Sequence, residues 1–284
     1  MGPMQATAMV EPELIRRAFL KHQLKVARAR EHFADFAPLV TLDNLGNPID
    51  YAPIHLAWVW HLTYCWNRGL HCVLMAPYEH GKTSGFAVPL ITWLVGRNLQ
   101  IRCKVISAGD ANAAARVEGA KAILETPIYR QVFPGVRIGR KWTGREAFVD
   151  RKGGGLDPTI HARGVDTGGI GQRADVLIFD DVVDSDNSME FLQRKKVKDR
   201  VHSKWMSRLN LQFGRVLWLA TPWHQDDATH EIMAMTGWCT LIQRVKGTLD
   251  GYEQEVIGAG PDYLQSVTSM ADAHYQALRE FAAL

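Results

Sequence analysis

Cysteine pairs, strong net charge and long apolar runs are all missing from this chain. Its 284 residues include only four cysteines, and none of them forms a Cys-x-x-Cys pair: Cys65, Cys72, Cys103 and Cys239. Such spacing predicts reduced thiols in a cytosolic protein and argues against a disulfide or zinc framework. The formal net charge of +3 does not indicate nucleic-acid binding, so any basic surface must be local.

Membrane and secretion signals are lacking as well. No apolar run reaches the roughly 20 residues that a membrane-spanning helix needs, and the first residues do not have the pattern of a signal peptide. Hydrophobic residues make up 46% of the chain, which is ordinary for a globular protein and excludes wholesale disorder. The length allows one large α/β domain, or a domain with a small appendage.

Short apolar runs alternate with helix-like segments. The expected strands are 71–76, 102–107, 147–150, 159–163, 175–179, 215–220 and 239–245. The expected helices are 11–36, 53–66, 86–95, 111–125, 188–210, 226–235 and 271–281. This alternation predicts an α/β fold with a mostly parallel sheet and helices on both faces. We expect an N-terminal helical arm at 1–45, a core at 46–245, and a C-terminal lid or linker at 246–284.

The most informative motif is Pro77-Tyr-Glu-His-Gly-Lys-Thr-Ser84, between an expected strand and an expected helix. A loop in this position turns backbone N–H groups toward phosphates, and the helix N-terminus adds partial positive charge. Lys82 would reach the β- and γ-phosphates, and Thr83 would place its hydroxyl on Mg²⁺. Ala76 stands where such loops usually have a first glycine. The nucleotide-binding residues expected here are His80, Gly81, Lys82, Thr83 and Ser84.

A second motif, Val176-Leu-Ile-Phe-Asp-Asp181, has four apolar residues followed by two carboxylates. It predicts a buried strand whose C-terminal end carries Asp180 and Asp181 at the sheet edge where α/β proteins bind ligands. Phosphate-loop enzymes need one carboxylate for Mg²⁺ and a group that orients and deprotonates the attacking water. Asp180 suits the first role and Asp181 the second. Two aspartates could also simply end a strand, but the Gly-Lys-Thr loop favours function.

The third motif is Trp218-Leu-Ala-Thr-Pro-Trp-His-Gln-Asp-Asp227, another apolar strand with a polar end. Thr221 would lie at the strand tip, where a hydroxyl can hydrogen-bond a γ-phosphate or the nearby water and so sense hydrolysis. His224 is better explained as a structural or helix-capping residue than as a catalytic one.

A basic stripe lies on the expected helix 188–210. It repeats every four residues as Lys196, Arg200, Lys204 and Arg208, beside an apolar stripe of Val197, Val201, Trp205 and Leu209. The apolar stripe should pack on the sheet. The basic stripe is either a solvated face or a surface for DNA phosphates or a neighbouring subunit, with Lys196, Arg200 and Lys204 as the DNA-binding candidates. Phosphate contacts would be independent of DNA sequence and sensitive to salt.

In this order, the three motifs resemble the ATPase domain of the large terminase subunit of tailed bacteriophages. The resemblance runs from about Pro53 to about Met235, and the third motif is its most specific part, with Pro222 where the family often has arginine. It implies a phosphate-loop (ASCE/RecA-like) ATPase with Lys82 in the Walker A motif and Asp180 in the Walker B motif. Pro53 and His55 resemble the segment that the family places ahead of the loop, near the adenine.

The resemblance also implies a function and partners. The chain would be a motor that hydrolyses ATP with Mg²⁺ and translocates double-stranded DNA into a procapsid in the host cytoplasm. It would assemble as a ring on the portal protein and work with a small terminase subunit. In such rings, an arginine completes the neighbouring site. Arg163 and Arg173 are the candidates, although a surface arginine is the commoner explanation for each.

Some features depart from the family pattern. Tyr78 stands where the family often has an arginine, Glu79 follows it, and Asp181 replaces a glutamate common in motor ATPases. These departures leave open a degenerate, weakly or non-catalytic terminase-like docking module. A helicase-like ATPase is a further alternative, but it would need a second motor domain. The roughly forty residues after the last core strand are too few for the nuclease domain of full-length large terminases.

Overall fold

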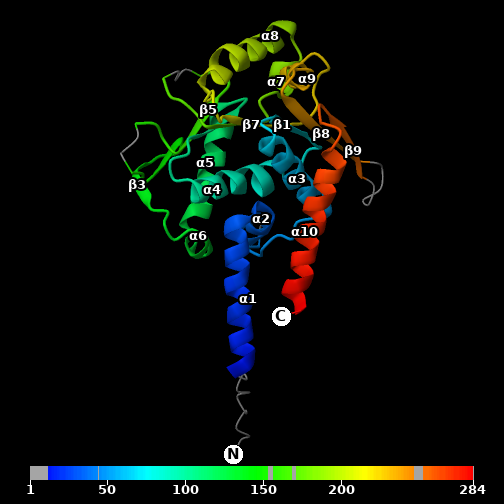
Figure 1. The fold of residues 1–284 in the computed structure, drawn as a ribbon. Coiled ribbons are helices and arrows are strands. Elements are labelled where there is room, and N and C mark those ends of the chain that lie inside the picture. The colour runs from blue at the N-terminus through cyan, green and yellow to red at the C-terminus, as the bar shows by residue number, and fades with distance from the viewer. Residues whose placement is uncertain (1–11, 44, 153–155, 168–170, 246–251, 284) are drawn as a thin grey trace, which may run out of the picture.

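Nine strands form one mixed sheet in the computed structural model, which describes residues 12–43, 45–152, 156–167, 171–245 and 252–283 (Figure 1). The strands are β1 (His71–Met75), β2 (Cys103–Ser107), β3 (Ile138–Trp142), β4 (Glu146–Val149), β5 (Ile160–Gly164), β6 (Val176–Asp180), β7 (Arg215–Ala220), β8 (Trp238–Val245) and β9 (Tyr252–Ile257). Their order is β3-β4-β5-β2-β6-β7-β1-β8-β9. The six strands from β5 to β8 run parallel, and the outer strands β3, β4 and β9 pair antiparallel. The expected α/β fold with a mostly parallel sheet is confirmed.

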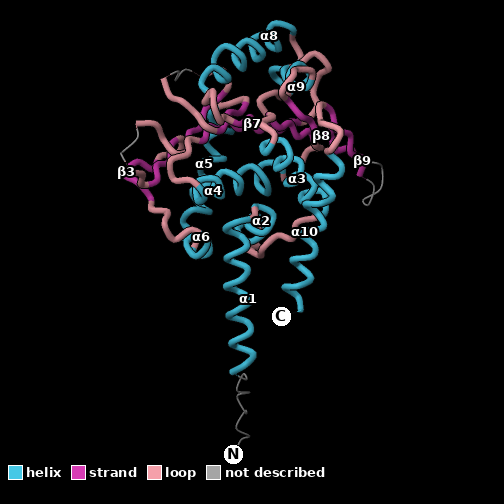
Figure 2. The backbone as a smooth tube through the Cα atoms, in the orientation of Figure 1, coloured by secondary structure: helices cyan, strands magenta, loops and turns pink. Residues whose placement is uncertain are grey.

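Helices cover both faces of the sheet (Figure 2). The α-helices are α1 (Pro12–Glu31), α2 (Phe33–Val40), α3 (Pro53–Asn67), α4 (Val88–Arg97), α5 (Asp110–Glu125), α6 (Pro127–Val132), α7 (Ser185–Ser188), α8 (Phe191–Arg200), α9 (Ala228–Met233) and α10 (Tyr263–Ala283). The described residues also form two π-helical turns, η1 (Lys82–Ala87) and η2 (Val201–Trp205), and one 3₁₀ turn, η3 (Met206–Arg208).

Successive side chains of a strand point to opposite faces of the sheet, and here they pack into two separate hydrophobic cores. On β6, Val176 and Ile178 pack with α2 to α6, whereas Leu177 and Phe179 pack with α8, η2 and α9. The expected apolar stripe of helix 188–210 is confirmed, because Val197, Val201, Trp205 and Leu209 all lie in the second core.

The terminal segments share the first core. Phe33 and Phe36 of α2 are buried there, while the start of α1 projects away from the sheet (Figure 1). In α10, the Tyr263 ring packs edge-on against Tyr64 of α3. β9 extends the sheet beyond β8. The described part of the expected C-terminal lid or linker is therefore a strand and a helix packed on the core.

Three expectations about local structure were wrong. The helix expected at 11–36 is interrupted by the extended backbone of His32. The helix expected at 188–210 divides into α8, η2 and η3, and the Trp205 indole donates a hydrogen bond to the Val165 carbonyl at 3.0 Å. The region 127–144, where no helix or strand was expected, contains α6 and β3. Thr126 caps α6, and β3 is a charged edge strand without a buried alternation, which periodicity does not detect.

All four cysteines are buried and free, as expected. Cys65 and Cys72 lie beside His61 where α3 packs on β1. The two ring nitrogens of His61 already have partners: the Tyr263 hydroxyl at 3.1 Å and the Cys239 carbonyl at 3.3 Å. We therefore interpret His61 as a hydrogen-bonded core residue. None of the helices in the described ranges is both long and apolar enough to cross a membrane.

Gly96 of α4 gives a test of this packing. A methyl group at Gly96 would overlap the ring of Phe133, which is 5% exposed and packs against Phe36 and Tyr129. We expect Gly96→Ala to lower the free energy of unfolding by about 1–3 kcal/mol, although alanine is the better helix former. Urea unfolding would measure this. Gly119→Ala on α5, whose added methyl meets only the two methyl groups of Val88, is the matched control and should be close to neutral. Equal stability of both variants would contradict the packing described here.

Candidate functional site

The sheet order brings the ends of the three motif strands together. β7 lies between β1 and β6, and all three run parallel. Their carboxyl ends therefore meet at one edge of the sheet, where open α/β sheets bind ligands.

The loop after β1 contains two residues with an uncommon backbone conformation. Glu79 and Gly81 both adopt left-handed backbone conformations, with φ of 61° and 79°. Such a conformation costs a non-glycine residue about 1–3 kcal/mol, and strain of this kind is concentrated at functional sites. The helical segment then begins at Lys82, and the first N–H groups of a helix have no acceptor within it. The Glu79 side chain is exposed to solvent.

The segment that leads into α3, together with the first turn of α3, supports this loop. His55 Nδ1 accepts the Ala52 N–H at 3.1 Å, so Nε2 carries the proton and donates to the His80 carbonyl at 3.1 Å. Burial lowers the pKa of His55, which favours this neutral form. The Tyr51 hydroxyl donates to the Gly85 carbonyl. The expected nucleotide contacts Pro53 and His55 thus lie beside the loop, where Pro53 starts α3 and His55 supports the loop backbone.

Lys82 is held inside the loop and is only 5% exposed. Its Nζ donates to the carbonyls of Ala76 and Pro77 at 2.6 and 2.8 Å, and to Thr221 Oγ1 at 3.1 Å. Burial lowers the pKa of Lys82, and the charges of Asp181 and Asp180 oppose that shift. The lysine therefore links the first motif to the third.

Asp180 is the centre of the site and is fully buried. The Thr83 hydroxyl donates to its two oxygens at 2.9 and 3.1 Å, and Arg116 Nε of α5 donates to Oδ2 at 2.6 Å. A carboxylate beside a threonine hydroxyl is the oxygen donor set that Mg²⁺ takes in phosphate-binding sites. The residues present thus fit a magnesium ion, with Thr83 and Asp180 as the protein groups that would hold it.

Asp181 follows directly and has the left-handed φ of 46°. Burial raises its pKa, the neighbouring Asp180 carboxylate adds to that shift, and Lys82 and Arg116 oppose it. Its Oδ1 lies 3.5 Å from Thr221 Oγ1, which also accepts from Lys82. Lys82, Thr83, Asp180, Asp181 and Thr221 are therefore one connected cluster, as the sequence predicts.

The two candidate arginines lie elsewhere. Arg173 is exposed and precedes β6, so it lies at the opposite edge of the sheet from Asp180. The seven residue steps from Arg173 to Asp180, at about 3.3 Å each, span roughly 23 Å. Arg163 is on β5, which β2 separates from β6. Within the described residues, neither arginine makes a hydrogen bond or ion pair with the cluster around Asp180.

The basic stripe is largely occupied by contacts within the chain. Lys196 and Arg200 approach Asp166 at 2.6 and 3.9 Å, and both are about half exposed. Lys204 is 5% exposed and donates to the Thr167 carbonyl. Lys204 was wrongly expected on a DNA-binding face, because the π-helical turn η2 directs its side chain inward.

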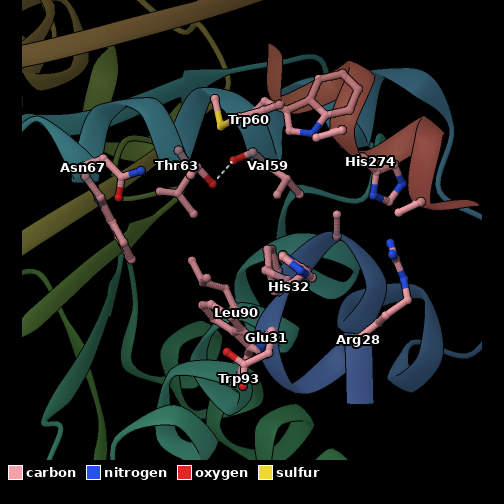
Figure 3. Close-up of a pocket in the computed structure, with 17 residues that line it drawn as sticks. Arg28, Glu31, His32, Val59, Trp60, Thr63, Asn67, Leu90, Trp93 and His274 are labelled. Atoms are coloured by element: carbon pink, nitrogen blue, oxygen red, sulfur yellow. Dashed lines mark hydrogen bonds between the residues drawn. The ribbon is translucent and has the colours of Figure 1, made fainter. Parts of the chain in front are cut away.

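A cavity of about 580 Å³ lies away from this cluster, between α3 on one side and α1, α2 and α4 on the other (Figure 3). His274 of α10 reaches its rim, and Trp60 and Trp93 contribute to its mostly apolar wall. No residue of the three motifs lines it. This cavity and the charged cluster are thus separate features.

Two residues that contact the cluster or its loop were not expected from the sequence. Tyr51 contacts the loop from 34 positions away, and nothing in its local sequence marks it. Arg116 did leave a signal: it lies on the stripe of Ala113, Val117 and Ala120, which packs in the core. A charged residue on a buried stripe needs a partner, and here the partner is Asp180.

Comparison with known proteins adds no assignment. No protein-family model matches this chain. A search of curated proteins likewise found no match.

Proposed function

We propose that this chain is the Mg²⁺-dependent ATPase motor domain of a phage DNA-packaging terminase. The observation that carries the proposal is the convergence of three motifs on one hydrogen-bonded cluster, in which Lys82 and Thr83 of the loop contact Thr221 and Asp180. The terminase assignment within phosphate-loop ATPases rests on the Thr221-Pro-Trp-His motif, which generic members lack.

Each residue has a role that its contacts support. Lys82 binds phosphate as a point charge when it exchanges its carbonyl partners for phosphate oxygens. Thr83 and Asp180 hold the magnesium ion, which neutralises phosphate charge when it is bound. Asp181, whose pKa is raised, accepts the proton of the attacking water. Thr221 contacts both Lys82 and Asp181, so it reports on the occupancy of the site.

A non-catalytic docking module of the same ancestry is the alternative. Tyr78 is 71% exposed at the tip of the loop, where an aromatic ring could serve a protein contact. In that case, ATP would bind weakly or not at all.

Hydrolysis assays separate the two functions. We would measure Mg²⁺-dependent release of phosphate from ATP over a range of protein concentrations, with and without double-stranded DNA. A rate per subunit that rises with both supports a motor whose sites are completed between subunits in a ring on the portal, together with the small terminase subunit. Absence of nucleotide binding and of hydrolysis under every condition, including with portal present, would contradict the ATPase proposal.

DNA contact is tested with the exposed part of the stripe only. We expect Lys196→Gln with Arg200→Gln to weaken binding of double-stranded DNA and to reduce the salt dependence, by about one unit of log–log slope per lost phosphate contact. Fluorescence anisotropy across a salt series would measure both. Lys195→Gln with Lys21→Gln is the charge-matched control. Lys204 stays unchanged because it is buried. An unaltered slope would show that this face does not contact DNA.

A further inference from the structure

Arg116 makes a contact that a magnesium site would not need. Its Nε lies 2.6 Å from Asp180 Oδ2, and its side chain is 18% exposed against 0% for that of Asp180. Within the described residues, this is the only hydrogen bond that the Arg116 side chain makes. A guanidinium has five N–H donors, so the groups at Nη1 and Nη2 remain available for other oxygens.

The ion pair lies on the carboxylate that is expected to hold the magnesium ion. Asp180 accepts hydrogen bonds from both the Thr83 hydroxyl and Arg116. The guanidinium therefore already lies at the carboxylate where Mg²⁺ is expected. Lys82 shows the same pattern, because its ammonium is held by the carbonyls of Ala76 and Pro77. The Arg116 guanidinium and the Lys82 ammonium are thus both hydrogen-bonded to protein oxygens at the edge of the site.

We propose that Arg116 competes with Mg²⁺ for Asp180 and then turns its guanidinium to the phosphates of the bound nucleoside triphosphate. This inference rests on the proposed function. Arg116 occupies Oδ2 of Asp180, and a metal ion on the same buried carboxylate would lie close to the guanidinium and repel it, so occupancy by the metal favours release of Arg116. A released guanidinium is stabilised by phosphate oxygens, which it binds through two parallel hydrogen bonds. Arg116 would thereby supply, from within the same chain, the arginine that Tyr78 replaces in the loop.

Two measurements with opposite expected signs test this. The first is Mn²⁺ binding without nucleotide, followed by electron paramagnetic resonance, with Mn²⁺ standing in for Mg²⁺. Arg116→Gln keeps a hydrogen-bond donor but removes the charge, so we expect Mn²⁺ to bind at least about 10-fold more tightly, the size of one charge-assisted hydrogen bond. The second is binding of a fluorescent ATP analogue with Mg²⁺, which we expect to be about 10-fold weaker in the same variant.

Controls separate this role from a structural one. If Arg116 were merely structural, its substitution would weaken the binding of both Mn²⁺ and the ATP analogue and would lower Tm. The proposal instead requires tighter Mn²⁺ binding and weaker ATP-analogue binding in a protein that remains folded. Arg97→Ala, which removes an exposed ion pair to Glu31, should change neither affinity. Arg116→Lys keeps the charge and should restore competition with Mn²⁺ in part. Unchanged or weaker Mn²⁺ binding by Arg116→Gln would overturn the inference. If the parent protein binds no nucleotide, the proposed function fails, and the Mn²⁺ result still decides whether Arg116 competes for Asp180.

Discussion

Lys82→Ala is expected to abolish detectable ATP hydrolysis and to weaken nucleotide binding. The ammonium is the only cation that contacts both the loop carbonyls and Thr221 within the described structure. Its loss removes charge stabilisation of the phosphates, and the loss of one such group typically costs about 100- to 1000-fold in rate. The measurements are steady-state phosphate release and binding of a fluorescent ATP analogue.

A buried lysine outside the cluster provides the control. Lys121 of α5 is 9% exposed and pairs with Glu118, so Lys121→Ala removes a comparable side chain without touching the loop. We expect this control to keep its activity if it folds. Hydrolysis by Lys82→Ala at the parental rate would place the phosphate site elsewhere and remove the main support for the proposed function.

The sequence was a good guide to the site because each motif lies at the end of an apolar strand. Parallel strands place their carboxyl ends at one edge, so Thr83, Asp180 and Thr221 could be expected close together before their distances were known. The sequence did not reveal that β7 lies between β1 and β6, because strand order depends on crossovers that local patterns do not encode.

Contacts made through the tertiary structure were the part that sequence could not predict. Spacing by four residues predicted one continuous basic face that included Lys204, but the π-helical turn η2 shifts the helical phase and buries that side chain. Arg116 lies in an alanine-rich helix 64 positions before Asp180, and no local pattern connects the two residues. His55 was assigned to the adenine by resemblance, and the structure places it against the loop carbonyl of His80.

Asp181→Asn is expected to separate binding from turnover. Lys82, Thr83 and Asp180 remain in place, so the nucleotide should bind with close to parental affinity. Asparagine cannot accept the proton of the attacking water, and loss of general-base catalysis costs about 100- to 10,000-fold in rate. Single-turnover hydrolysis together with equilibrium binding would measure both effects, with the exposed Asp186→Asn as the control. Parental turnover by Asp181→Asn would exclude this residue as the base.

The same substitution should also stabilise the protein. Burial and the Asp180 charge raise the pKa of Asp181 above the ordinary 3.8, so the folded state binds this proton more tightly than the unfolded chain does. The stability from this preference is present below pH 3.8 and is lost as the pH rises through the raised pKa. At neutral pH, the ionised carboxylate therefore disfavours folding, and Asp181→Asn should have the higher Tm. The gain should shrink as the pH falls, and over the same interval the parental hydrolysis rate should decline. A Tm advantage of Asp181→Asn that is independent of pH would mean that packing, and not charge, explains the stabilisation. A Tm advantage that shrinks over the same pH interval in which the parental hydrolysis rate declines would tie the stability and the activity to the Asp181 carboxylate.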